Sequence, residues 1–182
     1  IKSDDGKTFS EPIAAAFKEG HRCYDPCLWI DPLNRLWFTW ACAPEQAVYG
    51  AVCENPDAEV LKWSEIKKIG NDVMMNKPFV RKNGEWLFPI TVWAQNVWAG
   101  GVKSSADSDK KAFAYLSYDD GKSFHKLGGV DAPQRSYDEH MIIELNENEL
   151  AMFIRTHYGI AVSYSYDGGS TWTEAKDSGL GG

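Results

Sequence analysis

Three short stretches of this sequence combine acidic, basic and aromatic side chains of the kinds that could act on an acidic sugar. They are Arg22–Pro26, Asn76–Lys77 and the region from Arg135 to Tyr158. Cleavage of a glycosidic bond needs a proton donor and a second group that stabilises an oxocarbenium-like centre. The candidate catalytic residues are Asp25, Glu139, His140 and His157. The candidate substrate-binding residues are Arg22, Lys77, Tyr137, Arg155 and Tyr158.

Each of these residue types has a chemical role and a competing structural one. Arg155 offers a planar guanidinium whose paired donors match a carboxylate. The histidines have an ordinary pKa near ~6.5, which suits general acids and bases. In the structural interpretation, Glu139 forms an ion pair with Arg155 or Lys77, and the histidine rings bond to neighbouring backbone. Asp25 would then cap the turn before Pro26.

Three octapeptides with one shared pattern indicate the elements that position these side chains. The pattern Ser-x-Asp-x-Gly-x-Ser/Thr-aromatic occurs at 117–124 and 165–172, and at 2–9 with Lys2 in place of Ser. A tight hairpin with positive φ is expected at Gly6, Gly121 and Gly168. Backbone N–H groups are expected to bond to the carboxylates of Asp4, Asp119 and Asp167. The pattern is therefore a turn signature.

The aromatic residue of each corner recurs about every fifty residues. The intervals are 54, 61 and 48 residues along the series Phe9, Trp63, Phe124 and Trp172. Between these markers, short β-rich runs recur four to a unit, and no helical stripe is visible. This predicts an all-β fold, a segment of a six- or seven-bladed β-propeller. We expect the outer strand of one blade at 1–20 and whole blades at about 21–70, 71–130 and 131–182.

The propeller geometry explains how distant stretches would form one site. The starts of the inner strands, and the loops beside them, face one mouth of the channel, so the three stretches should converge there. The same rule adds Tyr24, Asn76, Arg135 and Asp138 to the expected cluster. The region 95–110 is expected to be a surface loop, with Trp98 as a candidate for stacking on a sugar.

Composition sets further bounds. A chain of 182 residues with 43% hydrophobic residues can bury one real core, and its net charge of −7 argues against nucleic acid as a partner. No apolar run approaches the ~18 residues of a membrane span. The cysteines Cys23, Cys27, Cys42 and Cys53 lack metal-site spacing, so we expect no metal or other cofactor, and either free thiols or a single disulfide. Cys42 and Cys53 are expected on neighbouring strands.

The corners resemble the Asp-box, or bacterial neuraminidase repeat, of the sialidase superfamily, and the resemblance covers essentially the whole chain as a divergent member. It implies that Glu139 is the base to a Tyr nucleophile and that Arg155 is one of three Arg residues that bind the sialic acid carboxylate. The Phe/Tyr-Arg-Ile-Pro segment of the first Arg is absent. The acid/base Asp, the third Arg and the nucleophile are expected outside this chain.

The resemblance implies a secreted or periplasmic exo-glycoside hydrolase that removes a terminal acidic sugar from a glycan. Its partners would be the glycan and the remaining blades of the parent propeller, and the chain alone is expected to be inactive. Two alternatives stay open. A propeller lyase or other exo-glycosidase for uronate-containing glycans would use His140 or His157 with Tyr158 as acid/base pair. A non-catalytic glycan-binding or assembly propeller would need no catalytic residues.

Overall fold

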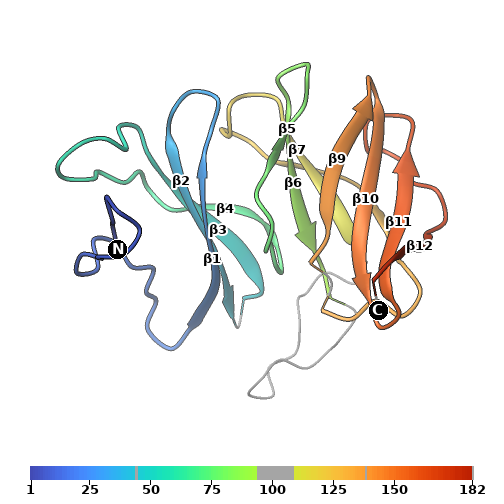
Figure 1. Ribbon diagram of the computed structural model, residues 1–182, viewed down its shortest axis with the longest axis horizontal. Coiled ribbons are helices and arrows are strands. Elements are labelled where there is room, and N and C mark those ends of the chain that lie inside the picture. The colour runs from blue at the N-terminus through green and yellow to red at the C-terminus, as the bar shows by residue number, and fades with distance from the viewer. Residues whose placement is uncertain (44, 94–108, 138, 182) are drawn as a thin grey trace.

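A computed structural model of the chain shows three four-stranded antiparallel sheets standing side by side (Figure 1). It describes all residues except 44, 94–108, 138 and 182. Most of the expected surface loop at 95–110, with Trp98, and also Asp138, therefore lie outside the described residues. No helix in the described part of the chain is long and apolar enough to cross a membrane.

Each sheet follows the order of its strands along the chain. The first sheet contains β1 (Arg22–Ile30), β2 (Leu36–Ala43), β3 (Ala47–Cys53) and β4 (Lys67–Asn71). The second contains β5 (Phe79–Val80), β6 (Trp86–Thr91), β7 (Ala112–Ser117) and β8 (His125–Val130). The third contains β9 (Met141–Asn146), β10 (Glu149–Thr156), β11 (Gly159–Ser165) and β12 (Lys176–Leu180). The predicted all-β fold with three four-stranded units is confirmed.

The up-and-down order gives the three sheets two distinct edges. At the lower edge in Figure 1, which we call the mouth edge, β1 and β9 begin and β2, β6 and β10 end. The opposite edge, which we call the corner edge, carries the hairpins β1–β2, β5–β6 and β9–β10 and the corners that follow β7 and β11. Because like strand ends share an edge, residues distant in the sequence meet there.

The octapeptide turns fold as the sequence predicts. In the second sheet, Asp119 Oδ1 accepts the N–H groups of Lys122 and Ser123 at 3.1 and 2.9 Å, and Asp119 Oδ2 accepts the Ser123 hydroxyl at 2.6 Å. The Ser117 hydroxyl donates to Asp119 Oδ1 and accepts the Gly121 N–H. The same contacts recur in the third sheet around Asp167, Ser165, Gly169 and Thr171. Positive φ occurs at Gly6, Gly121 and Gly168 as predicted, and at Gly169.

The first turn differs from this prediction in its carboxylate. Asp5 rather than Asp4 accepts the N–H groups of Lys7 and Thr8, both at 2.7 Å. Lys2 replaces the first Ser of the pattern, so the hydroxyl that orients the third-position carboxylate in the other turns is missing, and Ser3 bonds to Asp5 instead. The assignment of Asp4 to this role was wrong.

The outer strand expected within residues 1–20 is absent. The first strand of the described chain begins at Arg22, and the Ser10 N–H donates to the Lys2 carbonyl to close the first turn. An outer strand needs an inner neighbour for its ladder hydrogen bonds, and no preceding sheet stands beside this segment. The segment instead runs past the outside of the first sheet, where Ile1 and Ile13 line a groove together with Trp63.

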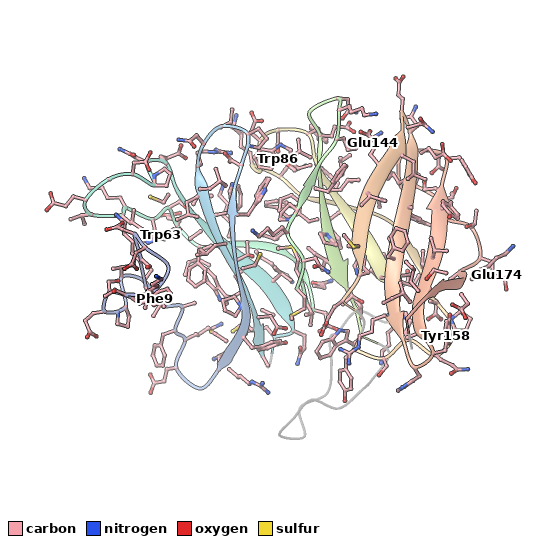
Figure 2. All side chains as sticks on the ribbon, in the orientation of Figure 1. Phe9, Trp63, Trp86, Glu144, Tyr158 and Glu174 are labelled. Carbon is pink, nitrogen blue, oxygen red and sulfur yellow. The ribbon has the colours of Figure 1, made fainter. Side chains whose placement is uncertain are left out.

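The core lies between adjacent sheets and follows the two-residue period of the middle strands. On β6, alternate residues Trp86, Phe88 and Ile90 face the first sheet and are at most 1% exposed. The equivalent residues on β10, Leu150, Met152 and Ile154, face the second sheet and are fully buried. Trp86 packs edge-on against Trp37 of β2, with ring centroids 6.1 Å apart (Figure 2). Each sheet thus covers one face of the next.

Two hairpin turns at the corner edge join neighbouring sheets through arginine. In the β1–β2 turn, Arg35 pairs with Asp31 at 2.7 Å and donates to the main-chain oxygen of Asp120 in the second sheet, also at 2.7 Å. In the β5–β6 turn the charges are reversed: Arg81 comes first and pairs with Glu85 at 2.5 Å. Arg81 also reaches Glu144 of the third sheet at 3.5 Å.

The corner carboxylates make stability depend on pH. The Ser123 hydroxyl, followed by backbone N–H groups, lowers the pKa of Asp119 to about 2, and the Thr171 hydroxyl does the same for Asp167. A carboxyl whose pKa is lower in the folded state stabilises the fold above its unfolded pKa of ~3.9, and this contribution disappears as the pH falls toward the folded pKa. We therefore expect Asp119→Asn to lower the urea midpoint at pH 7, and the difference from the unmodified chain to shrink between pH 4 and pH 2.

The matched control is Asp120→Asn in the same turn, because Arg35 contacts the main-chain oxygen of Asp120 rather than its carboxylate. The urea midpoint of Asp120→Asn should equal that of the unmodified chain at every pH. An Asp119→Asn deficit that stays constant down to pH 2 would contradict the assignment.

Candidate functional site

The mouth edge holds an ion pair between two predicted site residues. Glu139 stands just before β9 and Arg155 near the end of β10, and these strands pair antiparallel with Met141 opposite Phe153. Arg155 Nη1 lies 3.2 Å from Glu139 Oε1, with the two side chains 51% and 35% exposed. An ion pair this exposed adds little to stability. The guanidinium of Arg155 is therefore accessible to solvent and is not locked in place by this pair.

Two charged residues of the first sheet, Arg22 and Asp25, interact electrostatically with each other, and Asp25 also interacts with Glu139. Burial raises the pKa of Asp25, the negative charge of Glu139 raises it further, and Arg22 opposes the shift. Asp25 therefore lies within electrostatic reach of both residues although β1 and β9 belong to different sheets. The Arg22 guanidinium also lies 5.3 Å from the centroid of the Tyr24 ring. Asp25 thus senses both Arg22 of its own strand and Glu139 of the third sheet, which pairs with Arg155.

A side chain that precedes the second sheet holds the backbone beside Glu139 in place. The amide of Asn76, in the segment before β5, donates to the main-chain oxygens of Glu139 and His140 at 3.1 and 2.9 Å. These bonds fix the chain just where it enters β9. Lys77 is exposed, and its positive charge opposes the rise that burial causes in the pKa of the Cys27 thiol. Lys77 therefore lies within electrostatic reach of Cys27 in β1, and Glu139 pairs with Arg155.

The backbone around the site adopts left-handed conformations at residues other than glycine. At the mouth edge, positive φ values between 44° and 74° occur at Asp25 within β1 and, in the loops, at Gln46, Asp72, Gln134 and Tyr137. Such conformations cost on the order of 1–3 kcal/mol each and tend to cluster at functional sites. Three more, at Asn34, Asp120 and Asn148, lie in turns of the corner edge, so the charged cluster is what distinguishes the mouth edge as the candidate functional site.

Two buried polar residues beneath the site, Asp72 and Gln46, have no sequence signal that sets them apart. Asp72 follows β4, is completely buried, and accepts the Trp93 N–H at 3.1 Å. Gln46, 1% exposed, accepts the Asp72 N–H through its main-chain oxygen at 2.7 Å and lies 3.4 Å from the Tyr24 hydroxyl. Burial, followed by the charge of Asp72, raises the pKa of Tyr24 well above its usual range. Asp72 reads in the sequence as an ordinary turn residue.

Two predicted residues face the core rather than the mouth. His140 is 1% exposed, and its Nε2 lies 2.8 Å from the Phe113 carbonyl oxygen of the second sheet. This favours the structural interpretation of His140, since a ring inside the core cannot meet a substrate. Arg135 is also buried, and it donates to the carbonyl oxygens of Val92 and Lys110 at 3.2 and 2.6 Å.

The remaining predicted residues surround the cluster without joining it. His157 is exposed in the β10–β11 turn, where its N–H donates to the Gln134 carbonyl at 3.0 Å. Tyr158 packs partly buried against the core between the second and third sheets, near the mouth edge (Figure 2). Tyr137, 43% exposed, meets Trp93 edge-on with centroids 4.9 Å apart. Within the described residues no group of three or more His, Cys, Asp or Glu side chains could hold a metal ion.

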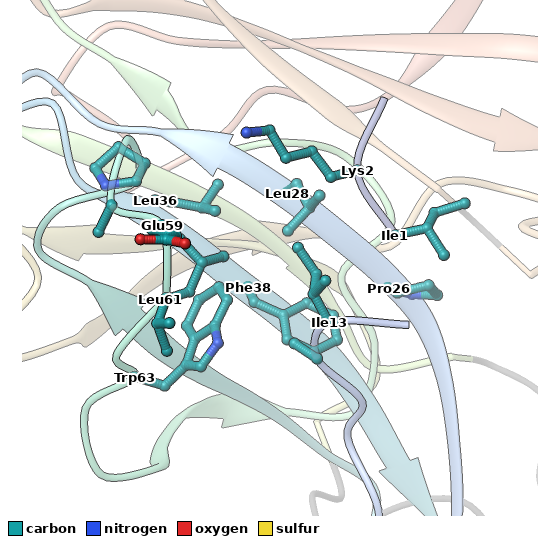
Figure 3. Close-up of a pocket in the computed structure, with 14 residues that line it drawn as sticks. Ile1, Lys2, Ile13, Pro26, Leu28, Leu36, Phe38, Glu59, Leu61 and Trp63 are labelled. Atoms are coloured by element: carbon teal, nitrogen blue, oxygen red, sulfur yellow. The ribbon is translucent and has the colours of Figure 1, made fainter. Parts of the chain in front are cut away.

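A large apolar groove lies elsewhere, on the outer face of the first sheet. It measures about 660 Å³ and is lined by Leu28, Leu36, Phe38 and Trp63, with Ile1 and Ile13 of the N-terminal segment across it (Figure 3). Leu36 and Phe38 occupy the positions on β2 that Trp86 and Phe88 occupy on β6. On the second sheet those positions are buried by the sheet before it. The groove is thus the face on which a preceding sheet would stand.

Comparisons with known proteins agree with this architecture. NanB with optactamide is similar to the chain at 16% identity and a TM-score of 0.50, over 71% of this chain and 18% of NanB. A point mutant of NanB sialidase from Streptococcus pneumoniae gives 15% identity and a TM-score of 0.49, over 71% and 18%. The first likeness concerns the fold alone, a partial β-propeller, and the matched region is less than a fifth of NanB. No curated protein matches. Residues 1–180 match the BNR repeat-like domain, so the chain belongs to the BNR repeat-like family.

Proposed function

We propose that the chain forms part of a carbohydrate-active propeller that binds an acidic sugar at the mouth edge and, in its full-length form, hydrolyses a terminal acidic residue from a glycan. The observation that carries the proposal is the half-exposed pair of Arg155 and Glu139 at 3.2 Å, with Arg22 and Asp25 within electrostatic reach. A site with two arginines and two carboxyls can hold a sugar carboxylate and move a proton.

The two carboxyls have different environments, which suits different tasks. Glu139 faces the guanidinium of Arg155, and a ligand carboxylate that took over Arg155 would leave Glu139 free to accept a proton. Asp25 has a raised pKa from burial and from the charge of Glu139, so it holds a proton more readily. Two carboxyls held in different environments are typical of acid and base assignments. In the sialidase-like mechanism, Glu139 would activate a Tyr nucleophile contributed by the rest of the propeller.

The test is turnover of a fluorogenic sialoside by the full-length protein. Glu139→Gln should lower kcat by roughly 10²–10⁴-fold, the usual contribution of a positioned acid or base. Arg155→Ala should weaken substrate binding by about 10–100-fold, because a charge-assisted hydrogen bond contributes roughly 1.5–3 kcal/mol. Glu149→Gln is the matched control: it removes a carboxylate from the opposite end of β10, where Glu149 accepts the amide of Asn146.

Two outcomes would replace this proposal. An unsaturated uronate absorbing in the near ultraviolet, lost in His157→Ala, would indicate a lyase. Glycan binding that depends on Arg155 without turnover of either substrate would indicate a binding module. Normal sialoside turnover in Glu139→Gln would contradict the role of Glu139 directly.

Further blades in the full-length protein remain a prediction, which the two outer faces of the described sheets support. The groove on the first sheet is apolar, and Leu28 beside it is 53% exposed. On the outer face of the third sheet, Met141 and Tyr164 are 48% and 36% exposed. Sheet faces that expose several large apolar side chains are normally covered by another sheet or by a partner. The sequence on either side of the chain checks the prediction, since it should contain further four-strand units.

A further inference from the structure

The pairing of β1 with β2 places two of the four cysteines directly opposite each other. Cys23 faces Cys42 in the register, and the two sulfur atoms lie 3.8 Å apart. Directly opposed residues in antiparallel strands have Cα atoms about 4.5–5.5 Å apart. This range lies within the 4.4–6.8 Å that disulfides span, so only the side chains have to rotate to bring the sulfurs to bonding distance.

The other two cysteines lie in different surroundings. Cys27 is opposite Thr39 in the register, beyond the irregularity in β1 that follows Tyr24, and its sulfur lies 3.9 Å from the Leu28 carbonyl oxygen. Cys53 is opposite Leu36 at the corner edge, whereas Cys42 is opposite Ala47 near the mouth edge. Cys42 and Cys53 thus occupy neighbouring strands as expected, but at opposite ends of the hairpin.

We propose that Cys23 and Cys42 form a cross-strand disulfide when the protein meets an oxidant of the disulfide class, such as oxidised glutathione. Cys23 is partly exposed and Cys42 is 1% exposed. The Cys23 thiolate attacks the oxidant, forms a mixed disulfide and releases one glutathione thiolate. The Cys42 thiolate then attacks the Cys23 sulfur and releases the second glutathione. The two protein thiols lose two protons and two electrons, and the oxidant is reduced to two thiols.

The crosslink would fix the part of β1 that enters the mouth edge. Cys23 lies between Arg22 and Tyr24, and the pairing of β1 with β2 is interrupted between Tyr24 and Cys27, where Asp25 has a φ of 53°. This strand end is therefore held by fewer ladder contacts than the rest of β1. A covalent bond to β2 at Cys23 ties it down independently of any ligand.

The test is incubation of the reduced protein with oxidised glutathione, followed by thiol titration, intact mass and peptide mapping. We expect the four free thiols to fall to two, the mass to fall by two hydrogens, and the peptides of Cys23 and Cys42 to be joined. Closing this loop should raise the Tm of the oxidised protein by roughly 5–10 °C over the reduced form.

Matched variants separate this pair from the others. Cys42→Ser should abolish both the crosslink and the gain in Tm, while the double variant Cys27→Ser with Cys53→Ser should retain both. Four remaining thiols, a lasting glutathione adduct on Cys23, or a crosslink that includes Cys27 or Cys53 in the unmodified sequence would each overturn the proposal. The peptide map of the unmodified protein decides the matter even where a variant fails to fold.

Discussion

Replacement of Arg81 by Met should destabilise the protein by about 3–5 kcal/mol, the usual cost of breaking a buried ion pair by removing one partner. The Arg81 side chain is 5% exposed, and it joins Glu85 of its own turn to Glu144 of the third sheet. The Glu144 side chain is 3% exposed, so it would stay buried without its cation (Figure 2). Urea unfolding monitored by tryptophan fluorescence would measure the loss.

A double variant provides the control for this prediction. Arg81→Met combined with Glu144→Leu removes both charges, and it should recover a large part of the lost stability because no uncompensated carboxylate remains. Lys82→Met, at the neighbouring exposed position, should change the unfolding midpoint little. If Arg81→Met unfolds at the same urea concentration as the unmodified chain, the link between the second and third sheets does not have the role we give it.

Gly121→Ala should cost about 2–5 kcal/mol. The residue has a φ of +79°, which costs other residues roughly 1–2 kcal/mol. A Cβ there would also lie 2.4 Å from Cζ2 of Trp37 and 3.1 Å from Trp86, and such overpacking typically adds 1–3 kcal/mol. Trp37 cannot easily yield, because it is 1% exposed and its indole N–H donates to Asp31.

The first octapeptide turn supplies a matched control for the glycine. Gly6 holds the equivalent place in the pattern and has a φ of +69°, but a Cβ there would meet nothing within 4 Å. Gly6→Ala should therefore show only the backbone cost. Equal urea midpoints for the two alanine variants would show that contact with Trp37 and Trp86 does not matter.

The fold was predictable because its signals are local. The octapeptides around Asp119 and Asp167 contain, within eight residues, every group that their turns use. The two-residue alternation along β6 and β10 likewise predicts which side chains face the core. The failure at Asp4 has the same origin, since one changed residue, Lys2, removes the hydroxyl that orients the carboxylate in the other turns.

The candidate site was predictable only where strand order alone brings residues together. Glu139 and Arg155 meet because the start of β9 lies beside the end of β10. The burial of His140 depends on how closely the second sheet packs against the start of β9. No sequence pattern around His140 predicts that distance. Asp72 and Gln46 likewise depend on contacts between loops of different strands.

The reversed charges of the two hairpin turns make the units non-interchangeable. In the first turn the arginine follows its acid by four residues, and in the second it precedes it by four. Arg35 reaches a main-chain oxygen at Asp120, whereas Arg81 reaches the carboxylate of Glu144. A copy of one unit inserted in place of another would present the wrong group to its new neighbour. A unit moved to another place in the series should therefore lose its arginine contact with the next sheet.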